Sequence, residues 1–338
     1  MKIIAAHAHS TGATGLFGTN TCCCNRLPST CSVGATLFGK DGQGASDLLK
    51  QADIAMYQVK TSGRNAFCFF DPQMLSAITQ RADMERDLRH ALAQQQFVLH
   101  YQVQVAEHAR PVGAEALIRW QHPHKGMVAP LQFIGLAEET GLIIAVGEWV
   151  LRTACLQLNS WETLPAAADL QLAVNVSARQ FRSPGFVDQV QNIVEETGVR
   201  THLLKLELTE SLVLDNIKDA SLKMQALKAL GVRFSMDDFG TGYSSLSYLT
   251  RLPLDQLKID QSFVRNIGQQ ASDSVVIDTI IGLGRSLGLE VIAEGVETAE
   301  QRDFLAQHGC QLCQGYLFGK PVPIEEFESW LIPNRIAL

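Results

Sequence analysis

Acidic and amide side chains recur at intervals through most of the chain, each at the end of a short apolar run. They are Glu115, Asn175, Glu207, Glu210, Asp237, Asp238, Glu294 and Glu297. Carboxylates that are crowded together resist ionising unless a cation lies between them. Oxygen ligands suit hard divalent ions such as Mg²⁺ or Mn²⁺ better than zinc. If the fold brings these side chains together, we expect them to form a metal site.

The adjacent pair Asp237-Asp238 carries the most information about that chemistry. Neighbouring strand residues point to opposite faces, but the chain can turn at a fraying strand end so that both carboxylates reach one rim. One carboxylate could then bridge two ions while the other binds the second. Two ions about 3.5–4 Å apart suit in-line attack on a phosphodiester. Lys258 could orient the attacking water, and Glu294 could bind the second ion or take a proton.

Eight strand-like segments carry these residues, and helix-like stretches separate most of them. The segments cover residues 97–104, 112–120, 170–177, 203–210, 232–240, 255–260, 289–297 and 310–318. Strands that alternate with helices indicate parallel pairing through crossovers. Eight such units in about 250 residues predict an α/β fold, a TIM-like (β/α)₈ barrel whose active groups lie at the carboxyl ends of its strands. The link over 105–111 is too short for a crossover, so one strand should be antiparallel.

The N-terminal part predicts a short, incomplete α/β segment before the barrel. Residues 1–30 show no sustained period and are expected to be disordered. The elements expected next are a strand at 31–38, a helix with Ser46 as N-cap and Gly63 as its stop, and a strand at 67–70. Two strands and one helix cannot bury an independent core. Asp71-Pro72 breaks the chain, and 72–84 should form a linker and the start of a long helix.

The composition of the chain argues for some classes of protein and against others. The 338 residues are 46% hydrophobic and 19% charged, as in a globular protein, and the net charge is −7. The acidic balance argues against a protein that coats DNA or RNA. No apolar run approaches the roughly 18–20 residues of a membrane span, and the start lacks the apolar core of a secretory signal. We therefore expect a cytoplasmic location.

The eight cysteines do not form a disulfide framework, because three are adjacent and the others are scattered. Cys310 and Cys313 make a single C-x-x-C, and no second ligand pair for a structural zinc stands nearby. Buried thiols are the expected alternative to a zinc or redox site.

Eight blocks of the sequence resemble, in order, the motifs of EAL phosphodiesterases. They are YQVQV, EALIRW, NVSARQF, ELTES, MDDFGTGYSSLSYL, LKID, AEGVE and QGYLFGKP. The resemblance covers the proposed barrel, residues 85–332. It implies a cyclic-guanylate-specific phosphodiesterase that hydrolyses the bacterial signalling nucleotide cyclic di-GMP to linear pGpG. The implied mechanism is two-metal-assisted in-line attack of water on one phosphodiester bond. Family members commonly form homodimers through the barrel.

The resemblance also implies roles for individual residues. The implied metal ligands are Glu115, Asn175, Glu207, Asp237, Asp238 and Glu294, with Mg²⁺ or Mn²⁺ as cofactor. The implied catalytic residues are Lys258, Glu294 and Glu115. The implied substrate contacts are Gln102, Leu117, Arg119 and Gln314. Glu210 and Glu297 would anchor the loop Gly240–Ser245, which lacks the spacing of a P-loop and is interpreted as a lid.

Upstream, the stretch ADIAMYQVKTSGRNAFCFF resembles the closing helix and strand of a GGDEF diguanylate cyclase domain. The signature loop of that family is missing from the chain. We interpret residues 31–71 as a C-terminal remnant without cyclase activity, and an unrelated extension is the alternative.

Two other classes of function compete with hydrolysis: a receptor that binds cyclic di-GMP without cleaving it, and a scaffold that binds no nucleotide. Because every metal ligand that the resemblance implies is present, the sequence favours hydrolysis.

Overall fold

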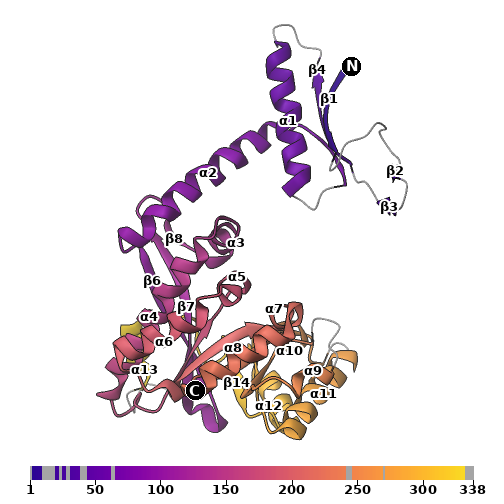
Figure 1. Ribbon diagram of the computed structural model, residues 1–338. Helices are drawn as coiled ribbons and strands as arrows, with labels where there is room; N and C mark the ends of the chain where they lie inside the picture. The colour runs from indigo at the N-terminus through magenta and orange to yellow at the C-terminus, as the bar shows by residue number, and fades with distance from the viewer. Residues whose placement is uncertain are drawn as a thin grey trace. The chain divides into compact units, whose positions relative to one another are not determined.

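The computed structural model describes residues 2–9, 20–22, 25–27, 31–38, 44–61, 65–240, 246–268 and 271–331. These residues form two compact units, Met1–Asp87 and Leu88–Leu338 (Figure 1).

The larger unit is a closed eight-stranded barrel. Its strands are β6 (Phe97–Val105), β7 (Pro111–His122), β9 (Gln171–Asn175), β10 (Leu204–Thr209), β11 (Arg233–Phe239), β12 (Gln256–Ile259), β13 (Glu290–Ala293) and β14 (Leu312–Gln314). They pair in that order, and β14 pairs back with β6. Neighbours from β7 to β14 are parallel, whereas β6 is antiparallel to both β7 and β14. The expected TIM-like barrel with one reversed strand is confirmed.

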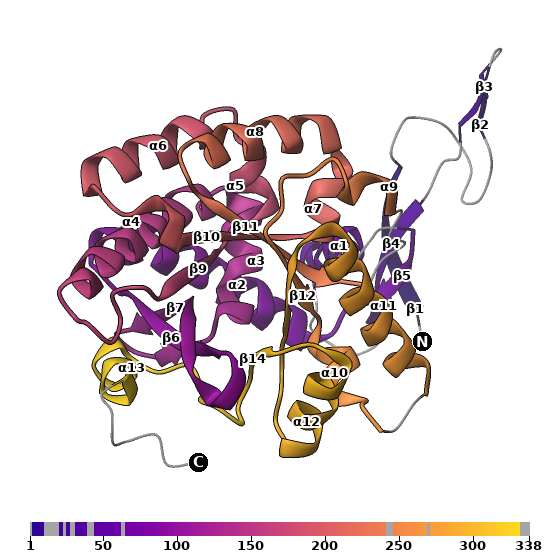
Figure 2. The same cartoon turned by 90° about the horizontal axis from the view of Figure 1, so that it is seen from below.

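Helices surround the strands, as the view in Figure 2 shows for α4, α6, α8, α11 and α12. The helices of this unit are α3 (Pro130–Thr140), α4 (Ile143–Glu162), α5 (Ala178–Arg182), α6 (Phe186–Thr197), α7 (Glu210–Asp215), α8 (Ile217–Ala229), α9 (Leu246–Leu249), α10 (Gln261–Arg265), α11 (Ala271–Leu287), α12 (Ala299–His308) and α13 (Ile324–Leu331). Short 3₁₀ turns lie at Glu107–Ala109 and Thr201–Leu203. A short strand that we did not predict, β8 (Gly126–Val128), forms a hairpin with β7.

The strands separate an apolar layer from a polar barrel interior. In β10, Leu204, Leu206 and Leu208 are fully buried, as expected for side chains that pack under the helices. The alternate residues Lys205 and Glu207 are also buried but face the barrel interior, where they contact side chains of β12. Burying charge is unfavourable unless it is paired, so this polar interior points to a function.

The smaller unit contains a three-stranded sheet of order β1-β4-β5, made of β1 (Lys2–His9), β4 (Cys31–Phe38) and β5 (Phe67–Phe69). Helix α1 (Ala45–Thr61) packs so closely on β4 that a Cβ on Gly34 would lie 2.1 Å from the backbone nitrogen of Met56. A hairpin joins β2 (Asn20–Cys22) and β3 (Asn25–Leu27), and α2 (Pro72–Ala93) follows the sheet.

Three expectations for this region differ from the structure. Ser46 is not the N-cap of α1, because the helix already begins at the residue before it, Ala45. The carbonyl of Gly44 accepts hydrogen bonds from the backbone N–H groups of Asp47 and Leu48. Residues 2–9 form β1 although we expected disorder over 1–30, because all eight residues pair with β4 and periodicity cannot reveal such a partner. Residues 72–84 are helical from the start, since Pro72 suits a first helical position. Gly63 lies outside the described residues.

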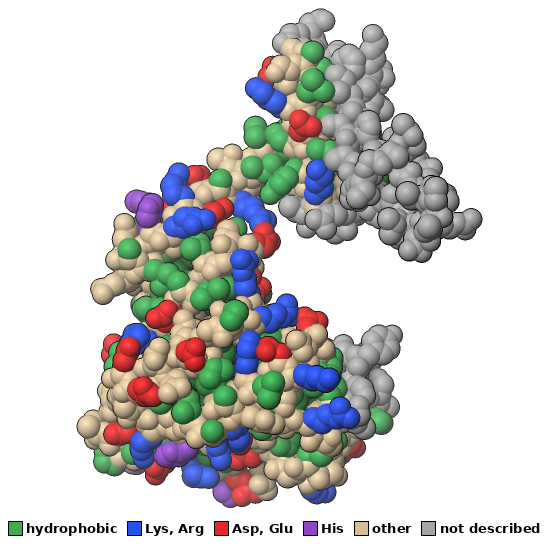
Figure 3. All heavy atoms as spheres, in the orientation of Figure 1, with side chains coloured by type: hydrophobic (Ala, Val, Ile, Leu, Met, Phe, Trp, Pro, Cys, Tyr) green, Lys and Arg blue, Asp and Glu red, His purple; other side chains and the backbone are tan. Residues whose placement is uncertain are grey.

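The surface of the barrel mixes charges of both signs. Acidic and basic side chains are interspersed over the face that Figure 3 shows. This distribution differs from the continuous basic face of proteins that grip nucleic-acid phosphates. Among the described residues, no helix has both the length and the apolar character to cross a bilayer.

Candidate metal centre

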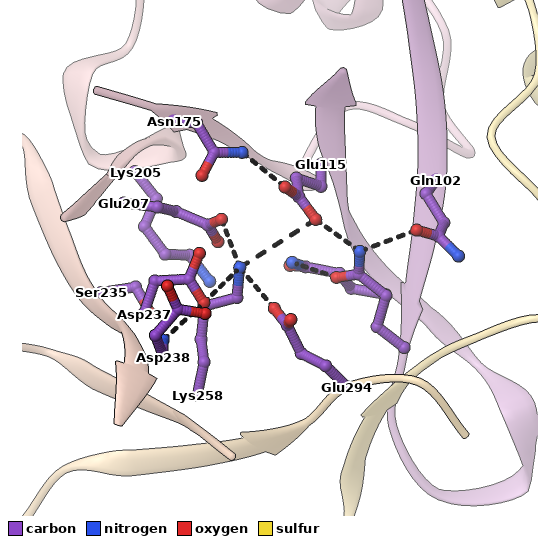
Figure 4. A network of polar contacts seen from close by, with 12 residues as sticks. Gln102, Glu115, Asn175, Lys205, Glu207, Ser235, Asp237, Asp238, Lys258 and Glu294 are labelled. Carbon is purple, nitrogen blue, oxygen red and sulfur yellow. Dashed lines mark hydrogen bonds and ion pairs between the residues drawn. The ribbon is translucent and has the colours of Figure 1, made fainter. Parts of the chain in front are cut away.

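Lys258, at the end of β12, lies at the centre of a ring of carboxylates (Figure 4). Its Nζ is 2.5 Å from Glu207 Oε2, 3.3 Å from Asp237 Oδ1 and 4.0 Å from Glu115 Oε2, and it also pairs with Glu294 Oε1. These residues come from β7, β10, β11, β12 and the residue that follows β13. The strand ends therefore bring together residues that are separated by more than half the chain.

One ammonium faces four carboxyl groups in this cluster, so the groups cannot all ionise together without further positive charge. Burial, reinforced by Glu115 and Asp237, raises the pKa of Glu207 to about 8 despite the neighbouring Lys258. Burial also raises the pKa of Glu294. For Lys258, burial alone would lower the pKa, but the surrounding carboxylates outweigh it and hold the pKa above its ordinary value. Both pKa directions are those expected of crowded carboxyl groups, which ionise more readily when a cation lies between them.

The arrangement of oxygens fits a divalent cation. Glu115, Glu207 and Glu294 each offer an oxygen, and these atoms lie within 4.8 Å of one another. Glu207 Oε1 is buried and has no hydrogen-bond partner among the described residues. A buried carboxylate oxygen without a donor is unfavourable, and a cation would supply its missing partner. Carboxylate oxygens are the ligands that Mg²⁺ and Mn²⁺ prefer.

A local irregularity brings Asp237 and Asp238 to the same end of the barrel. The register of β11 against β12 shifts between Met236 and Phe239. Asp238 adopts the left-handed conformation, with φ 55°, and its N–H donates to Asp237 Oδ1 over 2.9 Å. Burial and Asp237 raise the pKa of Asp238. The chain thus turns at this strand end, where Asp238 leaves the extended conformation.

Two amides hold Glu115 in place. Asn175 Nδ2 donates to Glu115 Oε1 over 2.5 Å. Gln314 Nε2 donates to Glu115 Oε2, also over 2.5 Å, and to Gln102 Oε1 over 3.0 Å. The cluster therefore includes the amides of Asn175, Gln102 and Gln314. In Asn175, the carbonyl oxygen is the atom that could bind a cation.

Glu210 lies beside the start of the loop that it was expected to anchor. Its carboxylate is buried, accepts a hydrogen bond from the Tyr248 hydroxyl over 2.8 Å and lies 3.4 Å from the backbone nitrogen of Gly240. Residues 241–245 lie outside the described residues. Glu297 is exposed, and its backbone N–H donates to Gln301 at the start of α12. The contacts described for Glu297 therefore do not connect it to the cluster or to the loop.

Leu117 and Arg119 follow Glu115 on the same face of β7 and are half-buried. The Arg119 guanidinium donates to the carbonyl of Ile118 over 2.9 Å. Its pKa is lowered by burial, although Tyr316 and Glu115 oppose the shift. The hydrogen bond described for the Arg119 side chain is to the backbone and not to the carboxylates.

Sequence reasoning missed a second polar layer, one step deeper in the barrel. Gln104, Lys205, Ser235 and Gln256 are all buried there. Lys205 Nζ donates to Gln256 Oε1 over 2.9 Å, and Ser235 Oγ donates to the same oxygen over 3.2 Å. Three of these residues stand two positions before a residue of the cluster, on the same strand face. Period-two alternation was the signal that could have found them.

The two cysteines of the C-x-x-C are buried thiols. The Cys310 thiol lies 3.5 Å from the carbonyl oxygens of Val291 and Leu312. Burial raises the pKa of Cys313 to about 11 and also raises that of Cys310. Neither thiol belongs to the acidic group that could hold a metal.

Comparison with known proteins places the barrel in a family. The model of the EAL domain matches residues 85–321. Among curated relatives, the chain is 44% identical to the bifunctional diguanylate cyclase/cyclic di-GMP phosphodiesterase MucR of Pseudomonas aeruginosa, over 87% of this chain and 43% of that protein. It is 39% identical to the cyclic di-GMP phosphodiesterase PdeR of Escherichia coli, over 89% and 45%. The chain spans less than half the length of these two relatives.

Solved structures agree with the family model. The phosphodiesterase part of PaMucR in complex with c-di-GMP superposes with a TM-score of 0.70 and 45% identity, over 72% of this chain and 99% of that one. The EAL domain of Mycobacterium smegmatis DcpA gives a TM-score of 0.61 and 36% identity, over 71% and 100%. The family match over most of the chain, joined to a barrel with carboxylates at its strand ends, shows that this protein belongs to the EAL domain family.

Proposed function

We propose that this protein hydrolyses cyclic di-GMP to linear pGpG in a reaction that depends on divalent metal ions. The observation that carries the proposal is the cluster of four carboxyl groups gathered around the single buried ammonium of Lys258. Two further facts support it. The relatives MucR and PdeR are named cyclic di-GMP phosphodiesterases, and the similar PaMucR structure contains c-di-GMP.

We propose two ions, Mg²⁺ or Mn²⁺, as cofactor. Glu115, Asn175, Glu207 and Asp237 would hold the first, and Asp237, Asp238 and Glu294 would hold the second. When bound, such ions would lower the pKa of water and neutralise charge on the phosphoryl oxygens.

The chain's own groups would complete the site. Lys258 would orient the attacking water by donating a hydrogen bond from its ammonium, and Glu294 beside it would take the proton. The P–O bond to the 3′ oxygen would break, because the product pGpG carries a 5′ phosphate, and the leaving 3′ oxygen would take up a proton from solvent. The guanidinium of Arg119 has donors suited to a phosphate. Gln102, Leu117 and Gln314 would contribute the remaining contacts to the substrate.

The test is metal-dependent formation of pGpG by the purified chain, with Glu207→Gln as the diagnostic variant. This change keeps the shape of the side chain but removes a charged ligand. We expect kcat to fall at least about 100-fold. Removing a group that only supports a metal ligand already lowers activity about 10–100-fold, and Glu207 is itself a proposed ligand. The matched control is Glu290→Gln, which alters an exposed carboxylate at the opposite end of the barrel, near the start of β13. This variant should keep the activity of the unaltered protein.

Tight binding of cyclic di-GMP without turnover in Mg²⁺ or Mn²⁺ would favour a receptor instead. No binding of the nucleotide by calorimetry would favour a scaffold.

We also propose that residues 31–71 are a remnant of a GGDEF domain. The aligned span with MucR, which is named a diguanylate cyclase as well as a phosphodiesterase, covers 87% of this chain and so extends upstream of the barrel. A homodimer through the barrel and a cytoplasmic location stay predictions.

A further inference from the structure

The reversed strand β6 places two glutamines on the inner face of the barrel. In the register with β7, Gln102 lies opposite Glu115 and Gln104 lies opposite Gly113. On its other side, Gln104 lies opposite Gln314 of β14. Side chains directly opposite each other in antiparallel strands come into contact. Gln104 is therefore adjacent to a residue that touches the metal centre, but it does not touch the centre itself.

These glutamines form a continuous chain of hydrogen bonds that ends on Glu115. Gln104 Nε2 donates to Gln314 Oε1 over 2.9 Å. Gln314 Nε2 donates in turn to Glu115 Oε2 over 2.5 Å. The same nitrogen also donates to Gln102 Oε1, and Gln102 Nε2 donates to the carbonyl of Gly319 over 3.1 Å.

The direction of every bond in this chain follows from the carboxylate. An ionised Glu115 can only accept hydrogen bonds, so Gln314 must present its NH₂ group to it. The carbonyl oxygen of Gln314 then faces Gln104. That oxygen also needs a donor, so Gln104 must present its own NH₂ group. If Gln104 were inverted, two carbonyl oxygens would face each other in the barrel interior.

Burial makes this chain sensitive to the loss of one member. Gln104 is 2% exposed and Gln314 is 4% exposed, so both amides rely on protein partners for their hydrogen bonds. The space for Gln104 depends on Gly113, where an added Cβ would lie 3.3 Å from Gln104 Oε1 and 2.7 Å from the carbonyl oxygen of Gln171. Strand β6 and its neighbours thus hold the Gln104 amide in a fixed place.

We propose that Gln104 is a positioning residue of the metal centre. It keeps Gln314 in the orientation in which the Gln314 amide holds Glu115 toward the cations. The inference rests on the proposed function in one respect, namely that Glu115 binds metal. Gln104 acts through Gln314 and contacts neither metal nor substrate.

A double-mutant cycle on Mn²⁺ affinity tests the proposal. The variants are Gln104→Leu, Gln314→Leu and the two combined, and isothermal titration with Mn²⁺ alone gives the affinity. Losing a group that supports a metal ligand weakens affinity about 10–100-fold, which we expect for Gln314→Leu. We expect about threefold to tenfold for Gln104→Leu, the size of one hydrogen bond. In the Gln314→Leu background, Gln104→Leu should add nothing further, because its target is already missing.

Kinetics give a second readout. With Gln104→Leu, kcat should fall at limiting Mn²⁺ and recover at saturating Mn²⁺. A residue that only packs the barrel would not produce this recovery.

The matched control is Gln256→Leu. Gln256 is also a glutamine that is 2% exposed in the deeper polar layer, but it bonds to Lys205 instead of Gln314. This variant should lose stability without losing Mn²⁺ affinity.

Unchanged Mn²⁺ affinity in Gln104→Leu, or a full additional loss in the double variant, would overturn the inference even if the unaltered protein cleaves cyclic di-GMP. Conversely, a protein that binds Mn²⁺ with the expected non-additive losses but does not form pGpG would keep the inference and reject the proposed function.

Discussion

At the scale of single residues, the centre depends on one buried cation. The side chain of Lys258 is 1% exposed and lies within 4.0 Å of four carboxylates. Burying any of these charges alone would be strongly unfavourable, and their mutual attraction in the barrel interior offsets that cost. The lysine therefore stabilises the protein before any metal binds, and a bound metal ion would let more of the surrounding carboxyl groups ionise.

Lys258→Met should lower the free energy of unfolding by about 3–5 kcal/mol in metal-free buffer, because it leaves buried carboxylates without their cation. Urea denaturation with and without Mn²⁺ measures the effect. Mn²⁺ should restore part of the loss, because binding to the folded state stabilises it. The control is Lys228→Met, whose partner is Asp255 at 2.6 Å in a more exposed pair. This control should lose about 1 kcal/mol or less of its free energy of unfolding. An equal loss in both variants would contradict the argument.

At the scale of elements, the strand ends set the position of each ligand, and their spacing leaves little freedom. Gly315 follows β14 directly after Gln314, and a Cβ there would lie 2.1 Å from the carbonyl oxygen and 2.3 Å from the nitrogen of Val296. Backbone atoms cannot move aside as the tip of a side chain can. The close approach of these two segments therefore fixes the backbone next to Gln314.

Gly315→Ala should lower the free energy of unfolding by about 1–3 kcal/mol, the usual effect of overpacking. Gly282→Ala is the control, because Gly282 lies in α11 with no atom within 4 Å of an added Cβ. There alanine should stabilise the helix by about 0.5–1 kcal/mol. Chemical denaturation of both variants measures the difference, and similar values for the two glycines would count against the steric explanation.

At the scale of the whole molecule, the barrel contains everything that the proposed reaction uses. Every residue of the metal centre lies in the unit Leu88–Leu338. The solved PaMucR chain is matched over 99% of its length by 72% of this chain. A domain with its own core can fold by itself.

A chain that begins at residue 72 should therefore unfold cooperatively and bind Mn²⁺ with an affinity within about twofold of the full chain, as expected for an independent domain. Calorimetry and thermal denaturation measure both properties. The full chain, purified in the same way, is the reference. A barrel that aggregates or loses Mn²⁺ binding without residues 1–71 would show that the smaller unit contributes to it.

The sequence by itself determined the type of fold and most of the chemical groups in the site. Strand periodicity and the short link at 105–111 were enough to predict a barrel with one reversed strand, because these signals are local. Carboxylates at successive strand ends were enough to predict that Glu115, Glu207, Asp237 and Glu294 would meet, since parallel strands of a barrel end at one rim.

Only the tertiary structure decided which atoms meet. Gln104 and Gln314 are 210 residues apart, and they pair only because the register of β6 against β14 closes the barrel. The left-handed turn at Asp238, the strand β1 and the true start of α1 likewise depend on partners that lie elsewhere in the chain or on backbone bonds. Local patterns determine elements, whereas strand register, a property of the closed sheet, determines contacts between them.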